Sequence, residues 1–265
     1  MFAVPSVEIS GLRIAFERVG EGPPLVLVHG ALSDCRVWQP QLEALASEFT
    51  VVAWDAPGCG HSEDPPESFR LPEYAEVLAG LIAALELSPA NVLGHSFGGA
   101  VALELALRHP AAVAKLVVAS GYAGWAGSLA ATEVERRLAL ALDVADCLAE
   151  GSEPTTMPGL FSAKMPDQAA AALKTIMSEI RPAATRSMAH ALAEADMRAA
   201  LPEIEAPTML IYGDADERST PIIAQDLHRR IPKSRLVMLP GLGHECALED
   251  PDRFNFEVRA FLRSP

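Results

Sequence analysis

Short apolar runs rich in β-branched residues recur along the chain, and segments of helical periodicity fill the intervals between them. The runs predict strands at Leu25–Val28, Thr50–Trp54, Asn91–Leu93, Lys115–Ala119, Pro207–Tyr212 and Arg235–Leu239. Intervening segments such as Leu71–Leu87 predict helices. Short strands that alternate with helices indicate a mainly parallel sheet covered on both faces. Two further runs, Val7–Ile9 and Leu12–Arg18, are joined around Gly11 and predict a leading antiparallel hairpin.

The alternation stops in the middle of the chain, from 123 to 199. Three alanine-rich segments there, separated by Pro and Gly, predict helices at Glu133–Ala149, Pro166–Ile180 and Pro182–Met197. They lie between the strand that ends at Ala119 and the strand that begins at Pro207. We therefore expect a core made of residues 1–122 and 200–265, with residues 123–199 inserted as a helical segment.

Composition narrows the class of protein. A chain of 265 residues, half of them hydrophobic, fits one α/β domain with an insertion. The net charge of −14 argues against a nucleic-acid surface, which needs a basic stripe. No apolar run approaches the roughly 20 residues that span a bilayer, and the N-terminal Met1–Pro5 lacks the features of a secretory signal. We therefore expect a cytoplasmic protein, and free thiols at Cys35, Cys59, Cys147 and Cys246.

One motif carries candidate chemistry. The predicted strand at Asn91–Leu93 runs into Gly94-His95-Ser96-Phe97-Gly98, and the helix-forming stretch Ala100–Arg108 follows at once. A strand, a Gly-x-Ser-x-Gly turn and a helix in this order are the layout of a nucleophile elbow. The tight turn holds the Ser96 hydroxyl clear of the sheet in a strained backbone conformation.

A serine nucleophile needs a base and an orienting acid, and both follow in the sequence. His244 comes after the last predicted strand, in a glycine-rich turn. Asp214 and Asp216 follow the strand before it. The order Ser96, Asp216, His244 is that of α/β-hydrolases, and the sequence resembles this superfamily from about Leu12 to Phe261.

Two further motifs carry the same resemblance. Leu25–Gly30 resembles the strand and His-Gly pair that open the oxyanion loop of the family, with Trp38 downstream. Trp54–Ser62 resembles its Asp-x-x-Gly-x-Gly-x-Ser turn. The resemblance implies the α/β-hydrolase fold: a mainly parallel eight-stranded sheet flanked by helices, with the segment 123–199 inserted as a lid.

The resemblance also implies roles for individual residues. Ser96 would be the nucleophile, His244 its base, and Asp216, in preference to Asp214, the acid that orients the imidazole. The backbone N–H groups of Phe97 and Ala31 would hold the oxyanion. We expect His95 to pack away from Ser96, His29 to brace the oxyanion loop and His61 to lie near the base of the cleft in a structural role. The substrate pocket is expected at Leu32, Tyr122, Trp125, Met157, Leu160 and Phe161.

The function expected from these residues is hydrolysis of a carboxylic ester or lactone through an acyl-enzyme. Alternatives with similar machinery are a carbon–carbon bond hydrolase of ring-cleavage products, a perhydrolase or acyltransferase, and a hydrolase-like ligand receptor with little turnover. No dinucleotide, phosphate or metal motif occurs in the sequence, so neither a cofactor nor a metal is expected. The expected partner is a small-molecule substrate, and the sequence leaves the oligomeric state open.

Overall fold

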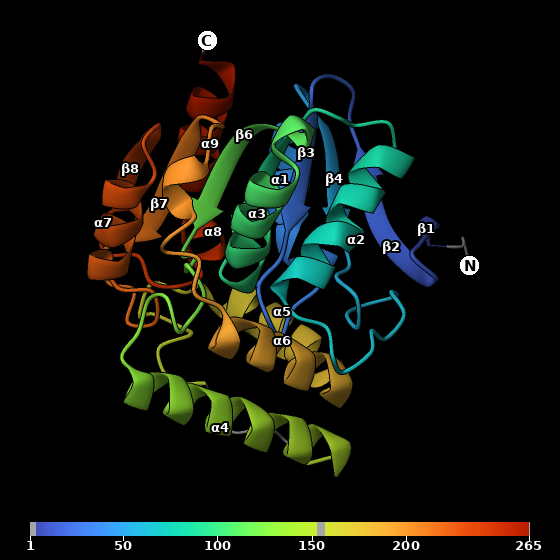
Figure 1. Ribbon diagram of the computed structural model, residues 1–265, viewed down its shortest axis with the longest axis vertical. Coiled ribbons are helices and arrows are strands. Elements are labelled where there is room, and N and C mark those ends of the chain that lie inside the picture. The colour runs from blue at the N-terminus through green and yellow to red at the C-terminus, as the bar shows by residue number, and fades with distance from the viewer. Residues whose placement is uncertain (1–3, 153–156, 265) are drawn as a thin grey trace.

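The computed structural model describes residues 4–152 and 157–264, which contain an eight-stranded sheet in the order β1-β2-β4-β3-β5-β6-β7-β8 (Figure 1). Met1–Ala3, part of the N-terminal segment interpreted above, and residues 153–156 of the predicted insertion lie outside the described residues. The strands are β1 (Ser6–Ile9), β2 (Leu12–Val19), β3 (Pro24–Val28), β4 (Thr50–Trp54), β5 (Ala90–His95), β6 (Val113–Ala119), β7 (Thr208–Gly213) and β8 (Ser234–Leu239).

The direction of the strands confirms the predicted mainly parallel sheet. β2 pairs antiparallel with β1, as expected of the leading hairpin, and it also pairs antiparallel with β4. All the other pairs, from β4 through to β8, are parallel. Their carboxyl ends therefore meet along one edge, where open α/β sheets bind ligands.

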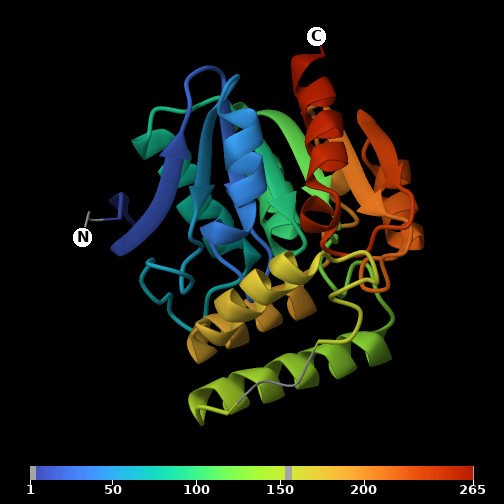
Figure 2. The ribbon, with the colours of Figure 1, turned by 180° about the vertical axis from the view of Figure 1, so that it is seen from behind.

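Helices cover both faces of the sheet, because the central strands are apolar on both sides. In β3, Val26 and Val28 pack into one buried layer, while Leu25 and Leu27 pack into the other. The first layer lies under α2 (Leu71–Ala84), α3 (Phe97–Arg108) and α7 (Pro221–Arg230). The second lies under the helices seen from behind in Figure 2, namely α1 (Gln39–Leu45), α8 (Cys246–Glu249) and α9 (Pro251–Arg263).

Three more helices lie across the carboxyl ends of the strands (Figures 1 and 2). They are α4 (Ala131–Ala149), α5 (Asp167–Ser178) and α6 (Pro182–Glu194), and they match the helices predicted for the middle segment. The two ends of this segment are hydrogen-bonded to each other. Trp125 N donates to Leu192 O at 2.7 Å, and Met197 N donates to Ala123 O at 3.0 Å.

Some helix ends differ from the sequence prediction. α6 ends at Glu194, not Met197, because Ala195 is extended and its carbonyl accepts a hydrogen bond from Gly127 N at 3.1 Å. α3 begins at Phe97, directly after the elbow serine. Short 3-10 turns occur at Cys35–Trp38, Pro110–Ala112 and Leu201–Glu203.

Two structural findings bear on the composition. The four cysteines are free, as predicted. In residues 4–152 and 157–264 no helix combines the length and the apolar character that crossing a membrane requires.

Candidate active site

Ser96 lies at the sharp turn between β5 and α3, at φ 52° and ψ −111°. A positive φ is strained for a residue with a Cβ, and the neighbouring backbone holds it in place. Ser96 N donates to Ala119 O at the end of β6, at 2.9 Å. The turn is also too tight for side chains on either side. A Cβ on Gly94 would lie 2.2 Å from Gly98 O, and one on Gly98 would lie 2.1 Å from Val28 O.

The His244 imidazole lies between the Ser96 hydroxyl and the Asp216 carboxylate. Its Nδ1 lies 3.0 Å from Asp216 Oδ2, and its Nε2 lies 3.0 Å from Ser96 Oγ. A carboxylate can only accept, so Nδ1 carries the proton. In the neutral ring Nε2 is then the acceptor for the serine hydroxyl. The geometry is that of a base poised to take the hydroxyl proton.

Asp216 is fixed by hydrogen bonds from its own loop. Its Oδ1 accepts from Arg218 N and from Ser219 N, both at 2.8 Å. Burial on its own would raise the pKa of Asp216, but His244 and these N–H groups outweigh it, so the pKa is lowered. The carboxylate therefore stays ionised beside the imidazole.

Asp214, the other candidate acid, is exposed and points elsewhere. Its Oδ1 accepts from Gly241 N at 2.5 Å, which fixes the glycine-rich turn before His244.

His95 supports the backbone of His244. His95 Nε2 donates to His244 O at 3.0 Å, and Glu245 Oε2 lies 3.9 Å from the same nitrogen. Burial lowers the pKa of His95, which keeps the ring neutral. The ring of His95 therefore does more than pack, because it fixes the loop that carries His244. It also lies at the cavity wall.

Two backbone N–H groups near Ser96 are candidates for an oxyanion hole. Phe97 N stands at the first position of α3, where no intrahelical acceptor exists. Among the described residues, no acceptor is bonded to Phe97 N or Ala31 N. The loop that carries Ala31 passes close to the serine, since a Cβ on Gly30 would lie 3.4 Å from Ser96 Cβ. The Phe97 side chain points into the core, with its ring centroid 5.0 Å from that of Tyr74.

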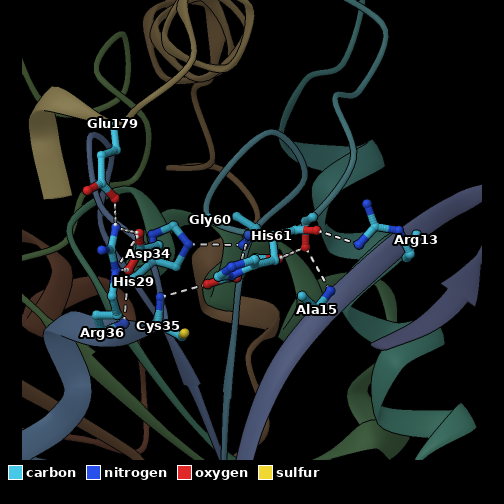
Figure 3. Close-up of polar contacts among 12 residues, drawn as sticks. Arg13, Ala15, His29, Asp34, Cys35, Arg36, Gly60, His61 and Glu179 are labelled. Atoms are coloured by element: carbon cyan, nitrogen blue, oxygen red, sulfur yellow. Dashed lines mark hydrogen bonds and ion pairs between the residues drawn. The ribbon is translucent and has the colours of Figure 1, made fainter. Parts of the chain in front are cut away.

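The loop after β3 is braced from below by polar contacts (Figure 3). His29 Nδ1 donates to Gly30 O at 2.7 Å, and His29 Nε2 accepts from Ala56 N at 3.0 Å. Burial lowers the pKa of His29, so the ring is neutral, as accepting from a backbone N–H requires. The ring thus joins this loop to the turn after β4, in the bracing role expected of it.

Asp34, at the far end of the same loop, is tied to α5 through one arginine. Arg36 Nη2 lies 2.6 Å from Asp34 Oδ2 and 2.6 Å from Glu179 Oε2, at the end of α5 (Figure 3). Burial opposes ionisation of Asp34, but the Arg36 hydrogen bonds outweigh it and lower the pKa of Asp34. The contact connects the loop after β3 to the helices above it.

Asp34, Cys35 and Asp55 also bring three candidate metal-ligand atoms, two carboxylate oxygens and a thiol sulfur, within 4.8 Å of one another. Their groups are already engaged with protein partners. Arg36 pairs with Asp34, and Asp55 accepts from Cys35 N at 2.9 Å and from His61 N at 2.8 Å. Burial raises the pKa of the Cys35 thiol, which disfavours the thiolate that metals bind. The cluster is best explained as bracing.

A cavity opens above Ser96 and His244, between the sheet edge and the helices α4 to α6. Residues from the core, from α4, α5 and α6, and from the loop before α5 form its wall. It is walled by six of the residues singled out from the sequence: Ala31, Leu32, Tyr122, Trp125, Met157 and Leu160.

Two of the sequence predictions are wrong. Phe161 does not line the cavity; its ring lies 5.8 Å from Lys174 Nζ on α5. The next residue, Ser162, donates to Glu249 Oε2 at 2.7 Å, which holds this stretch against the core. His61 does not lie at the base of this cleft either: its side chain is 65% exposed.

The cavity also contains charged residues that the sequence analysis overlooked. Arg136 and Arg137 reach it from α4, Arg218 from the loop after β7, and Glu245 follows His244. Arginine and glutamate side chains are usually solvated, so their residue type alone gives no reason to select these four residues. One signal was available for Arg137, which shares a helix face with the apolar Ala141 and Val144.

Comparison with known proteins agrees with this architecture. Residues 25–257 match the profile of a family described as "Alpha/beta hydrolase family". The chain is 28% identical to a putative carbamate hydrolase RutD of Pantoea ananatis, over 92% of this chain and 89% of that protein.

Two solved structures are similar over nearly their whole length. The enol-lactonase of Burkholderia xenovorans is 26% identical, with a TM-score of 0.82 over 98% of this chain and all of that one. A thermophilic esterase of Thermogutta terrifontis, solved with malate bound, is 27% identical. Its TM-score is 0.83, over 98% of this chain and 97% of that one.

Proposed function

Because the chain belongs to the alpha/beta hydrolase family, we propose that it is a serine hydrolase that cleaves a carboxylic ester or lactone through an acyl-enzyme. The observation that carries the proposal is the hydrogen-bonded series from Ser96 through His244 to Asp216. The esterase and enol-lactonase relatives support the substrate class, since both names describe cleavage of an acyl–oxygen bond.

The proposed reaction uses the three side chains in sequence. Ser96 Oγ attacks the carbonyl carbon while His244 Nε2 takes the hydroxyl proton, and buried Asp216 stabilises the imidazolium that forms. The N–H groups of Phe97 and Ala31 stabilise the oxyanion. His244 then protonates the leaving alkoxide, which departs as an alcohol. Water, deprotonated by His244, attacks the acyl-enzyme; collapse of the second tetrahedral intermediate releases the acid and returns the proton to Ser96.

We further propose that residues 123–199 act as a lid and the remainder as the catalytic core. The hydrogen bonds that close the two ends of the inserted segment on each other support this division, since they make it a separate unit. Trp125, Met157 and Leu160 give the lid side of the cavity its apolar wall. Such a wall suits the carbon skeleton of a substrate and excludes water from the reacting bond.

Turnover of simple esters and lactones by the wild type and by Ser96→Ala tests the function. We expect repeated turnover by the wild type, and a loss of about 10⁴-fold or more in kcat for the variant with its fold intact. A folded wild type that binds these compounds and never turns them over would contradict the proposal and favour a receptor. Turnover that persists in Ser96→Ala would place the nucleophile elsewhere.

A further inference from the structure

Guanidinium groups from two separate elements meet at the cavity wall. Arg137 comes from α4 and Arg218 from the loop that follows Asp216. The two are joined directly, since Arg137 Nη2 donates to Arg218 O at 3.0 Å. The cavity of a strongly acidic protein thus has two linked arginines in the wall that it shares with Ser96 and His244, in addition to the more exposed Arg136.

Each of the three guanidinium nitrogens of Arg137 donates to a neighbour. Its Nε donates to Glu133 Oε1 at 2.7 Å, and its Nη1 donates to Tyr122 Oη at 3.1 Å. The guanidinium carbon lies 5.8 Å from the centroid of the Tyr122 ring and 6.0 Å from that of Trp125. With its side chain 8% exposed, Arg137 is a fixed part of the wall.

Arg218 is bound on one edge only. Its Nη1 donates to Pro158 O at 3.1 Å. Within residues 4–152 and 157–264, neither Nε nor Nη2 of Arg218 has an acceptor, and no carboxylate forms an ion pair with it. Burial lowers the pKa of this partly buried cation and Arg137 lowers it further, although Tyr122, Asp216 and Glu245 oppose the shift. A guanidinium in such a place is stabilised by an anion.

The open edge of Arg218 has the geometry of a carboxylate fork. Nε and Nη2 are the pair that binds both oxygens of a carboxylate side by side. The same edge does so elsewhere in this protein: Arg136 Nε and Nη2 donate to Glu133 at 2.7 and 2.8 Å. A ligand carboxylate would complete Arg218 in the same way.

Among the described residues, none of the nearby acidic groups forms an ion pair with Arg218. Glu133 is bound to Arg136 and Arg137, and Asp216 is bound to His244. Glu245 also lines the cavity, and its carboxylate lies by His95.

We infer that the substrate of the proposed hydrolase carries a carboxylate remote from the bond that is cleaved, and that Arg218 binds it. Arg137 adds positive charge and holds the Arg218 backbone in place. The inference rests on the proposed function for the identity of the cleaved bond, whereas the anion site depends only on the two arginines. Both arginines reach the cavity, so the free carboxylate lies inside it together with the reacting carbonyl.

Matched pairs of esters test the inference. Monomethyl succinate is compared with methyl isocaproate, and acetoxyacetate with isobutyl acetate; in each pair an isopropyl group replaces the carboxylate. The first pair places the charge in the acyl part and the second in the alcohol part. We expect the wild type to favour the acid of at least one pair about tenfold or more in kcat/KM.

Two variants of Arg218 separate the effect of its positive charge from that of its paired Nε and Nη2 donors. Arg218→Gln should lower that preference about 10-fold to 100-fold, while Arg218→Lys should recover part of the preference. Arg198→Gln is the control, because Arg198 is an exposed arginine paired with Asp196 outside the cavity. A wild type without preference for the acid in either pair overturns the inference, as does a preference that survives in folded Arg218→Gln.

A binding measurement distinguishes failure of the inference from failure of the proposed function. Monomethyl succinate and acetoxyacetate are titrated into the Ser96→Ala protein with and without Arg218→Gln. If the acids bind to Ser96→Ala but not to the protein that also carries Arg218→Gln, and the wild type turns over no ester, the anion site stands and the proposed function is overturned. Repeated turnover of neutral esters, with neither acid preference nor binding that depends on Arg218, would overturn the anion site and keep the proposed function.

Discussion

Asp216 Oδ2 lies 3.0 Å from His244 Nδ1, and the two side chains are 0% and 2% exposed. Both residues stand on loops that follow adjacent parallel strands, β7 and β8. The contact fixes the tautomer of the imidazole and turns Nε2 toward Ser96. The elbow alone does not determine this, because Asp214 precedes Asp216 by only two residues on the same loop.

Replacement of each aspartate by asparagine should separate their roles. Asp216→Asn should lower kcat about 10⁴-fold, since an amide in this place favours the wrong tautomer of His244. Asp214→Asn is the matched control and should change kcat less than tenfold, because Asp214 is exposed and bonds only the turn at Gly241. Steady-state kinetics on one ester checks both. The reverse ranking would move the acid two residues upstream.

Leu160 and Phe161 are neighbours that should affect acyl preference differently. Leu160 lines the cavity and Phe161 lies against α5. Leu160→Ala should shift the relative kcat/KM for acetyl, butyryl and octanoyl esters by about 1–3 kcal/mol. Phe161→Ala should leave the ratio unchanged and act on stability instead. A shifted ratio in Phe161→Ala alone would show that the wall is formed as the sequence first indicated.

Arg36 should stabilise the fold through Asp34 more than through Glu179. Arg36→Met leaves the Asp34 carboxylate, 2% exposed, without its partner. We expect a loss of about 2 kcal/mol in the free energy of unfolding, discounted because Arg36 itself is nearly half exposed. Glu179→Gln removes only an exposed pair and should cost less than about 1 kcal/mol. Urea unfolding of both variants measures this, and equal losses would contradict the account.

His29 should make the fold less stable in mild acid. Burial lowers its pKa below the 6.5 of the unfolded chain, so below that pH the unfolded state binds more protons. Stability is therefore full above pH 6.5 and falls as the pH drops. Protonation would also remove the acceptor for Ala56 N.

His29→Gln should reduce the difference in the free energy of unfolding between about pH 7.5 and pH 5.5 by up to about 1.4 kcal/mol. The reduction should appear even if the variant is less stable at both pH values. An undiminished difference in His29→Gln would show that other groups cause the acid sensitivity.

The sequence predicts the fold and the reactive residues because both depend on local patterns. The strands are short runs of apolar residues bounded by turns, and the elbow needs Gly94 and Gly98 at fixed spacing, where any Cβ would strike backbone. The helix ends are less predictable. α6 ends where the Ala195 carbonyl accepts a hydrogen bond from the distant Gly127, and no local signal marks that position.

The cavity wall depends on tertiary packing and is harder to predict. Leu160 and Phe161 are both apolar and adjacent, and tertiary contacts such as that of Ser162 with Glu249 determine how this stretch lies. Arg218 resembles a solvated loop residue in sequence, although burial and the contact with Pro158 turn it into part of the site. Contacts between residues far apart in sequence therefore decide which of these residues form the cavity wall.

Covalent labelling by a fluorophosphonate, read by mass spectrometry of the modified peptide, tests the central claim most directly. We expect one adduct per chain, on Ser96, that is absent in Ser96→Ala. Ser120→Ala is the matched control, because Ser120 also follows a strand at positive φ (49°) and is fully buried; it should label as the wild type does. An adduct on another residue, or labelling that persists in Ser96→Ala, would contradict the account.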